Sequence, residues 1–167
     1  MTNEEVLVGR LRNLGASELA VLRGAIGKRL GEDFRVFQVF TKFYWPLRDE
    51  THLPRLPCYL IATLYPWHAM AGGHDSLGAA MGKAASFHFR EWQREANRLE
   101  WLLQSDGQEL ALRLLEAIRR LARKGIPIEW AKLLRDVCQW NALEGRVQCE
   151  WARDFLKHSS KGGSHAR

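Results

Sequence analysis

The sequence has few cysteines, and their spacing matches no common pattern for disulfide bonding or metal binding. Its 167 residues contain three, Cys58, Cys138 and Cys149, an odd number without a Cys-x-x-Cys pair. Neither a disulfide framework nor a thiolate zinc site is therefore expected. Cys58 also has no histidine in a matching pattern, so we interpret it as a packed thiol rather than a nucleophile.

Long hydrophobic runs are also absent. No stretch approaches the ~18–20 apolar residues that a membrane span needs. Residues 1–5 (MTNEE) are acidic and lack the basic-then-apolar order of a signal peptide. We therefore expect a cytoplasmic protein with no membrane contact. The apolar share of 46% excludes a disordered tail protein and is enough for a real core.

Strand signals are nearly absent, because no stretch alternates apolar and polar residues with β-branched enrichment. Periods near 3.6 recur instead, and they predict an all-α protein. Asp33 is expected to cap one helix that Pro46 ends, and Ser105 with Gln108 has the spacing of a capping box. Helices are expected at about 4–13, 18–30, 34–45, 59–67, 77–83, 86–103, 105–124, 128–140 and 144–157.

The expected organisation is two packed helical lobes or bundles, of which the C-terminal half is a helical bundle. We place an N-terminal lobe at residues 1–84 and the C-terminal bundle at 85–157. The Ser- and Gly-rich segment 158–167 (HSSKGGSHAR) is expected to be a disordered tail.

Enzyme motifs fail on spacing. Gly78–Lys83 (GAAMGK) resembles a phosphate loop, but Leu77 and Ala84 stand where the motif needs glycine and Ser or Thr. Small residues that allow close helix packing are the favoured interpretation of this segment. His68, His74 and Asp75 flank a Gly-Gly turn without the His-x-x-x-His spacing of a metal site. We therefore expect no catalytic residue, metal or cofactor, and an unrecognised hydrolase is the weaker alternative.

The net charge of +6 is concentrated in the C-terminal third, where residues 105–167 carry 12 basic and 8 acidic side chains. At about 100° per residue, Arg90, Arg94 and Arg98 share one helix face. Glu91 and Glu95 can pair with them, so a solvated face and a phosphate-binding face are equally good interpretations.

The next helix gives a stronger signal. Its basic side has no compensating acid nearer than Glu116 in the run 118–124, which favours phosphate contact. Arginine predominates, and its guanidinium suits bidentate phosphate binding. The basic residues on this side are Arg113, Arg119, Arg120, Arg123 and Lys124.

Tryptophan is frequent, with seven in the chain. Trp92, Trp130, Trp140 and Trp151 lie on predicted core stripes, so core packing is favoured for them. Trp101 continues the side that carries Arg94 and Arg98. Its indole can stack on a base, contact a partner protein or cover a seam between lobes.

The order of several segments resembles the CasB family, the small subunit of Cascade, the type I-E CRISPR surveillance complex. Upstream similarity includes residues 19–23 (LAVLR), the aromatic stretch 34–44 and residues 62–68 (ATLYPWH), and the likeness spans about residues 10–156. The segments that carry it in the C-terminal half are 98–105 (RLEWLLQS), 114–121 (LLEAIRRL), 125–130 (GIPIEW), 133–137 (LLRDV), Trp140 and 151–155 (WARDF).

The resemblance implies an all-helical, non-catalytic subunit, present as two copies in head-to-tail contact within the complex. Its expected partners are the other Cascade subunits, guide RNA, target DNA and the displaced single strand. Arg23 and Arg98 stand where the family carries arginine, and Arg119 lies in its basic stretch. At three further positions where the family often has a basic residue, this sequence has Gly24, Asn97 and Leu115. We expect other basic residues to make those contacts instead, namely Lys28, Arg29, Arg94 and Arg113.

Two further classes of function are compatible with a small basic helical chain. A helix-turn-helix regulator needs Asn, Gln or Ser beside arginine to read bases, whereas the basic faces here are almost purely arginine. A protein-only adaptor would explain the tryptophans without nucleic acid, and it would bind independently of salt.

Overall fold

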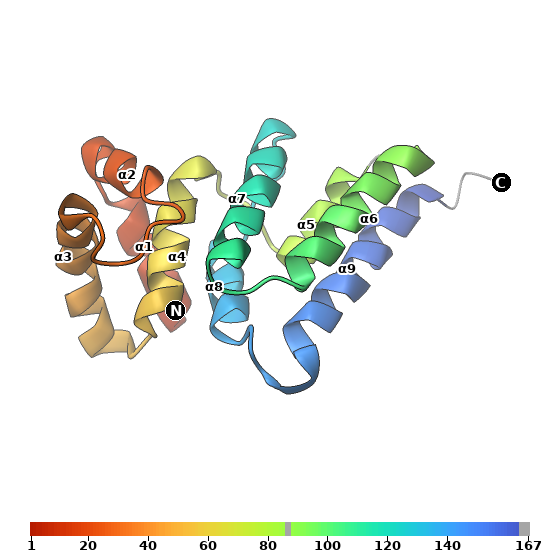
Figure 1. The fold of residues 1–167 in the computed structure, drawn as a ribbon. Helices are drawn as coiled ribbons and strands as arrows, with labels where there is room; N and C mark the ends of the chain where they lie inside the picture. Colours follow the sequence, from red (N-terminus) through yellow and green to blue (C-terminus); the bar gives the residue numbers. More distant parts are fainter. Residues whose placement is uncertain (86–87, 164–167) are drawn as a thin grey trace.

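A computed structural model describes residues 1–85 and 88–163 of the chain. Over these residues it contains nine α-helices, two 3-10 helices and no strand, which confirms the all-α fold class (Figure 1). The helices are α1 (Asn3–Arg12), α2 (Ala16–Arg23), α3 (Phe34–Thr51), α4 (Arg55–Leu64), η1 (Tyr65–Trp67), α5 (Leu77–Ala84), α6 (Phe89–Leu103), α7 (Gly107–Arg123), α8 (Trp130–Cys138), η2 (Leu143–Gly145) and α9 (Arg146–Gly163).

Helix ends differ from the predictions in several places. The second helix stops at Arg23, with Gly24 as its C-cap, rather than near residue 30, and Gly27, with a positive φ of 80°, lies in the turn that follows. Asp33 caps α3 as predicted, accepting hydrogen bonds from the N–H groups of Arg35 and Val36. The prediction of a capping box at Ser105 and Gln108 is wrong. The Ser105 hydroxyl donates to the carbonyl of Leu102 instead of capping α7, which begins after Asp106.

Pro46 does not end α3, contrary to the prediction. The helix continues to Thr51, although proline removes one backbone donor and crowds the preceding turn. Tyr44 and Leu47, on either side of the proline, are buried at 4% and 0% exposure, while Pro46 itself faces solvent. Burial of the neighbouring side chains therefore holds the helix together across the proline.

The predicted start of the sixth helix near residue 86 lies outside the described residues, and α6 begins at Phe89. The tail expected from His158 overlaps the end of α9, which runs to Gly163; residues 164–167 lie outside the described part. The lobe boundary at residue 84 stays a prediction. Helix α5, on its N-terminal side, packs extensively along α9 of the C-terminal half.

Figure 1 shows α1–α4 at one end of the molecule, α7 and α8 in the middle, and α5, α6 and α9 at the other end. Helix α8 packs on α1 and α4, and α7 contacts α4, η1, α5 and α6. The middle helices therefore join the two ends through one continuous hydrophobic core.

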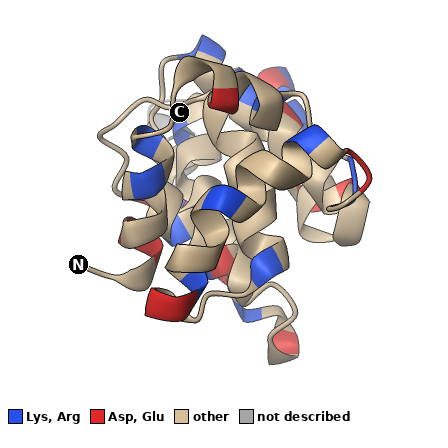
Figure 2. Cartoon of the chain, turned by 90° about the vertical axis from the view of Figure 1, so that its left-hand side faces the viewer, with Lys and Arg blue, Asp and Glu red and all other residues tan. Residues whose placement is uncertain are grey.

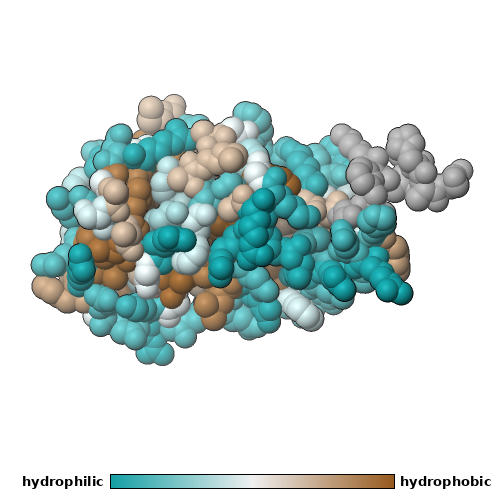
Figure 3. Space-filling view, turned by 90° about the horizontal axis from the view of Figure 1, so that it is seen from above, coloured by the Kyte–Doolittle hydropathy of each residue, from teal (hydrophilic) through white to brown (hydrophobic). Residues whose placement is uncertain are grey.

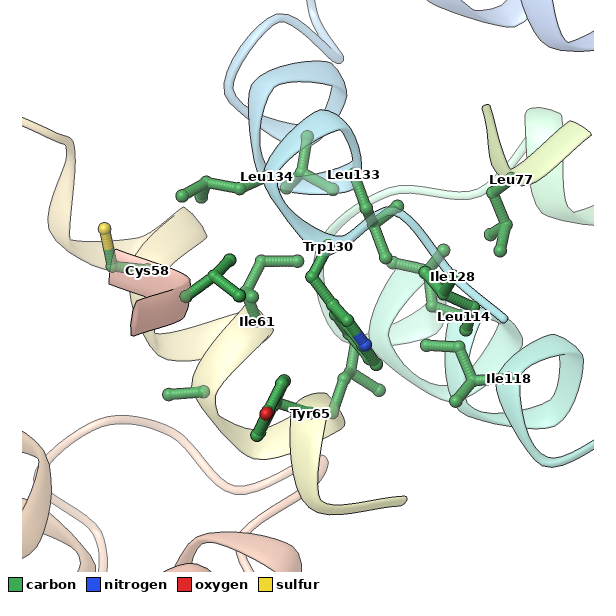
Figure 4. Packing of buried hydrophobic residues seen from close by; sticks show 14 of the residues in the cluster. Cys58, Ile61, Tyr65, Leu77, Leu114, Ile118, Ile128, Trp130, Leu133 and Leu134 are labelled. Carbon is green, nitrogen blue, oxygen red and sulfur yellow. The ribbon is translucent and has the colours of Figure 1, made fainter. Parts of the chain in front are cut away.

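Trp130 lies at the centre of this junction. It is 3% exposed, and its ring packs edge-on against Tyr65 at a centroid distance of 5.4 Å. Its indole N–H donates to the carbonyl of His68 at 3.0 Å, so the buried donor is satisfied. Figure 4 shows Trp130 with Ile61 and Tyr65 on one side and Leu114 and Ile118 of α7 on the other.

Close helix packing explains the glycines of α5, as the sequence favoured. A Cβ atom at Gly78 would collide with the backbone of Trp151, and one at Gly82 would lie 2.6 Å from the carbonyl oxygen of Phe155. The segment 78–83 is therefore a helix surface pressed against α9. It is not a loop that cradles phosphate.

Core packing is also confirmed for three of the four tryptophans predicted there. Trp130, Trp140 and Trp151 are buried, and the rings of Trp140 and Trp151 pack edge-on at 5.1 Å. Trp92 is half-buried and tilts against Phe155 at a ring-centroid distance of 5.9 Å.

No helix in the described part is long and apolar enough to cross a bilayer.

Candidate nucleic-acid interface

Two arginines from distant parts of the chain meet on one tryptophan ring. The guanidinium carbon of Arg23 lies 4.2 Å from the ring centroid of Trp67, and that of Arg119 lies 5.3 Å from it. These are cation–π distances. We call Arg23, Trp67 and Arg119 the Trp67 cluster.

The fold brings these three residues together from three separate elements. Arg23 is the last residue of α2, Trp67 is the last residue of η1, and Arg119 lies in the second half of α7. Helix η1 contacts both α2 and α7, so it sits between them. Both arginines are exposed and Trp67 is half-buried. The cluster therefore presents two cations to solvent from a rigid aromatic base.

Trp67 has an unused polar atom. Its indole N–H is buried and has no hydrogen-bond partner within the described residues. The sequence does not single out Trp67, because no periodic pattern links it to residues 44 positions before it or 52 after it. Its local signals in the sequence are its place directly after Pro66 and within the segment 62–68.

A second tryptophan–arginine pair lies on α6 and α7. Trp101 is 53% exposed, and the guanidinium of Arg113 lies 5.3 Å from its ring centroid. Arg113 also approaches the carboxylates of Glu109 and Glu116 at 3.8 and 3.6 Å. The cation is therefore partly neutralised by its own helix, and Trp101 keeps an exposed face.

Glu95 changes the interpretation of two predicted phosphate ligands. Its carboxylate is in contact with the guanidinium of Arg120 and lies 3.1 Å from that of Arg98, and Glu95 itself is only 3% exposed. The interpretation that the basic run of α7 has no acid nearer than Glu116 is therefore wrong. An acid distant in sequence compensates Arg120 across the α6–α7 interface.

The buried face of α6 explains why this pair was missed. This face carries Glu95 and Leu102, so it is rotated away from the core stripe on which Trp92 was predicted, and Trp92 itself is only half-buried. Two other candidates are also occupied. Lys124 donates from Nζ to the carbonyl of Ala84 at the end of α5, and Lys28 pairs with Asp33 at 3.0 Å.

The remaining candidates are exposed and make no ion pair with any residue that the structure describes. Figure 3 shows the face of the molecule on which α7 ends. Hydrophilic side chains gather over the middle of this face, and hydrophobic patches lie toward the end that holds α2 and α3. At the end formed by α1–α3, basic and acidic positions are interspersed (Figure 2). The exposed candidates are Arg29, Arg90, Arg94 and Arg123.

The described residues form neither a metal-binding group nor a reactive thiol at Cys58. No group of three His, Cys, Asp or Glu side chains suited to a metal ion occurs within residues 1–85 and 88–163. His68 is buried, with its Nε2 atom 2.6 Å from the carbonyl oxygen of Ile126. Burial raises the pKa of the Cys58 thiol to about 12, so Cys58 is protonated at neutral pH.

Comparison with known proteins gives one family. A family model described as CRISPR-associated protein Cse2 matches residues 18–156. A CRISPR-associated protein Cse2 from Thermus thermophilus is 32% identical over 97 residues, which cover 58% of this chain and 54% of that protein. The match thus spans about half the length of that relative.

Solved structures share the whole fold. CasB from M. ruber superposes with a TM-score of 0.79 at 23% identity, covering 99% of each chain. A chain of a CRISPR RNA-guided surveillance complex superposes with a TM-score of 0.78 at 20% identity, covering 99% of this chain and 98% of that one. At these identities the likeness establishes the arrangement of helices.

Proposed function

The chain belongs to the CRISPR-associated Cse2 family, as its resemblance to CasB predicted, and on this premise we propose that it is the non-catalytic small subunit of a type I-E Cascade complex. In this role it binds the sugar–phosphate backbone of guide RNA, target DNA and the displaced strand, and it stabilises the open R-loop. The observation that carries the proposal is the Trp67 cluster, which joins Arg23 and Arg119 on one exposed surface.

The cluster suits backbone binding for a physical reason. A guanidinium stacked on an indole loses less freedom when it meets a phosphate, because its plane is already oriented. Its N–H groups still point outward and can donate to a phosphate in a bidentate manner. Phosphate contacts carry no sequence information, and guide–target pairing supplies specificity in RNA-guided complexes. The subunit therefore needs rigid cations rather than base-reading side chains.

The proposed partners follow from the family and from its structural relatives. One structure with this fold is a chain of a CRISPR RNA-guided surveillance complex, which supports other Cascade subunits as partners. A second copy of this chain, guide RNA, target DNA and the displaced strand complete the proposed set. The proposal assigns no catalytic residue, no metal and no cofactor to the subunit.

Binding of the purified protein to a fluorescent single strand of mixed sequence tests the proposal across a salt series. Log affinity should fall steeply with log salt. Arg23→Glu with Arg119→Glu should weaken binding and reduce the salt slope by roughly one for each phosphate that is no longer bound. Arg12→Glu, an exposed arginine on α1 that makes no ion pair within the described part of the chain, is the matched control.

Each alternative has its own outcome. If the double variant binds the strand with the same affinity and the same dependence on salt as the wild type, Arg23 and Arg119 do not contact phosphate. Preference for one duplex sequence by about a thousandfold would indicate a base-reading regulator. Capture of a protein partner with no salt-dependent nucleic-acid binding would indicate an adaptor.

A further inference from the structure

A groove of about 710 Å³ lies where the N-terminal helices meet α7 and α8. The turn between α2 and α3, the start of α4, the start of α7 and the end of α8 form its walls. Its volume is in the range of sites that hold several side chains or a drug-sized molecule. Much of the lining is aliphatic, and includes Ile26, Leu30, Leu56, Leu60, Leu110 and Val137. We call this the seam groove.

Two large apolar side chains of the seam groove are exposed to solvent. Leu56 is 64% exposed and Phe37 is 38% exposed, although both are large hydrophobic residues. Exposed apolar residues that border a concave surface mark interaction sites more often than single scattered ones do. The seam groove therefore has the form of an uncovered interface.

The charged side chains that line the seam groove are mostly positive. Arg29 and Arg55 line it and pair with no acid among the residues that the structure describes, whereas Lys28 is held by Asp33 at 3.0 Å. Among the described residues of the lining, Asp106 is the only acid. A complementary occupant therefore carries apolar side chains for the lining and a carboxylate for Arg29 or Arg55.

Nucleic acid is a poor fit to the seam groove because, of the three aromatic residues that line it, only Phe37 is exposed. Tyr59 and Trp140 are buried, and their polar atoms donate to the carbonyls of Lys28 at 3.1 Å and Ser105 at 2.9 Å. They therefore offer no free face on which a base can stack. The groove also borders the first turn of α7, whereas Arg119 lies 12 residues further along, roughly 18 Å by helical rise.

We propose that the seam groove binds a short apolar segment with an acidic side chain, supplied by a different protein subunit of the complex. The inference rests on the proposed function for the existence of that complex. It adds a protein-docking surface separate from the Trp67 cluster. Leu56 fills the role of an anchor at the groove mouth, and Arg29 and Arg55 hold the carboxylate.

Leu56→Asp tests the proposal in the complete complex. The change removes an apolar anchor and repels an acidic segment, while an aspartate in the first turn of α4 is favourable to the helix. Leu156→Asp on α9 is the control, because Leu156 is 56% exposed and lies outside the seam groove. Retention of the subunit by a tagged complex is measured, together with binding of the isolated subunit to a fluorescent single strand.

We expect Leu56→Asp to weaken retention by about tenfold or more, as the loss of one interface anchor does. Leu156→Asp should be retained like the wild type, and both variants should bind the single strand normally. Wild-type retention of Leu56→Asp would overturn the inference alone. Failure of the wild-type subunit to join the complex would overturn the proposed function, and this inference with it.

A photoreactive side chain at position 56 identifies the occupant within the same complex. Cross-linking to another protein subunit is the expected result. Cross-linking to RNA or DNA, or to a second copy of this chain, would overturn the assignment. Absence of any cross-link in a complex that retains the subunit would overturn it as well.

Discussion

The carboxylate of Glu95 on α6 forms an ion pair with the guanidinium of Arg120 on α7, although Glu95 is only 3% exposed. Arg98 approaches the same carboxylate at 3.1 Å. A charge at this depth is tolerated only when a partner compensates it. The pair thus links two helices of the C-terminal half, and Arg120 has a structural role that its place in a basic run conceals.

Charge reversal should separate this structural arginine from its exposed neighbour. Arg120→Glu places a second carboxylate beside buried Glu95, so we expect a loss of about 3–5 kcal/mol in the free energy of unfolding. Arg123→Glu, an exposed position one turn further along the same helix, should change it by no more than about 0.5 kcal/mol. Urea unfolding measures both. Equal stability of the two variants would contradict the structural role of Arg120.

Two glycines in helices should respond to alanine in opposite directions. Gly78→Ala drives a methyl group into the backbone of Trp151, which cannot rotate away, and should cost about 1–3 kcal/mol. A methyl group at Gly9, inside α1, would meet no atom within 4 Å, so Gly9→Ala should stabilise by roughly 0.5–1 kcal/mol. Thermal unfolding of both variants checks the signs. A harmless Gly78→Ala would show that α5 and α9 are not in close contact.

Asp136 should make stability depend on pH. Burial raises the pKa of its carboxyl above the ordinary 3.8, against the opposing effect of the hydrogen bond that Trp151 donates at 2.8 Å. The folded protein therefore binds this proton more tightly than the unfolded chain does. Its contribution to stability is greatest at low pH and declines as pH rises through the window between the ordinary and the raised pKa.

Asp136→Asn removes this titration and keeps an oxygen that can accept the Trp151 hydrogen bond. The stability of the wild type relative to Asp136→Asn should therefore fall as pH rises over an acidic-to-neutral range that begins near the ordinary carboxyl pKa. Urea unfolding across this range measures the difference, and Asp49→Asn on the exposed side of α3 controls for the loss of one carboxylate. A difference that rises with pH would contradict the direction of the shift.

The three thiols should react at very different rates. Cys149 is exposed, whereas burial raises the pKa of Cys58 to about 12 and that of Cys138 to about 11. Thiolate is the reactive form, so an aromatic disulfide reagent at neutral pH should modify Cys149 first. The Cys149→Ser variant should lose this fast phase. Rapid modification of Cys58 without denaturant would show that α4 opens in the native protein.

Sequence alone determined the properties that depend on neighbours along the chain. Apolar spacing within each helix predicted the all-α fold, Asp33 stood where its carboxylate meets the first free N–H groups of α3, and the small residues of 78–82 indicated close packing. The order of segments identified the family, because it records many such local choices at once.

Only the tertiary structure decided which charges are free. Periodicity relates residues three or four positions apart on one helix, but it does not say how that helix is rotated against the next. That rotation buries Glu95 and occupies Arg120, and the crossing of α2, η1 and α7 brings Arg23 and Arg119 onto Trp67. The pairing of charges across helices is set by packing of the whole core, and for this reason the arginine face of α7 divides into structural and exposed members.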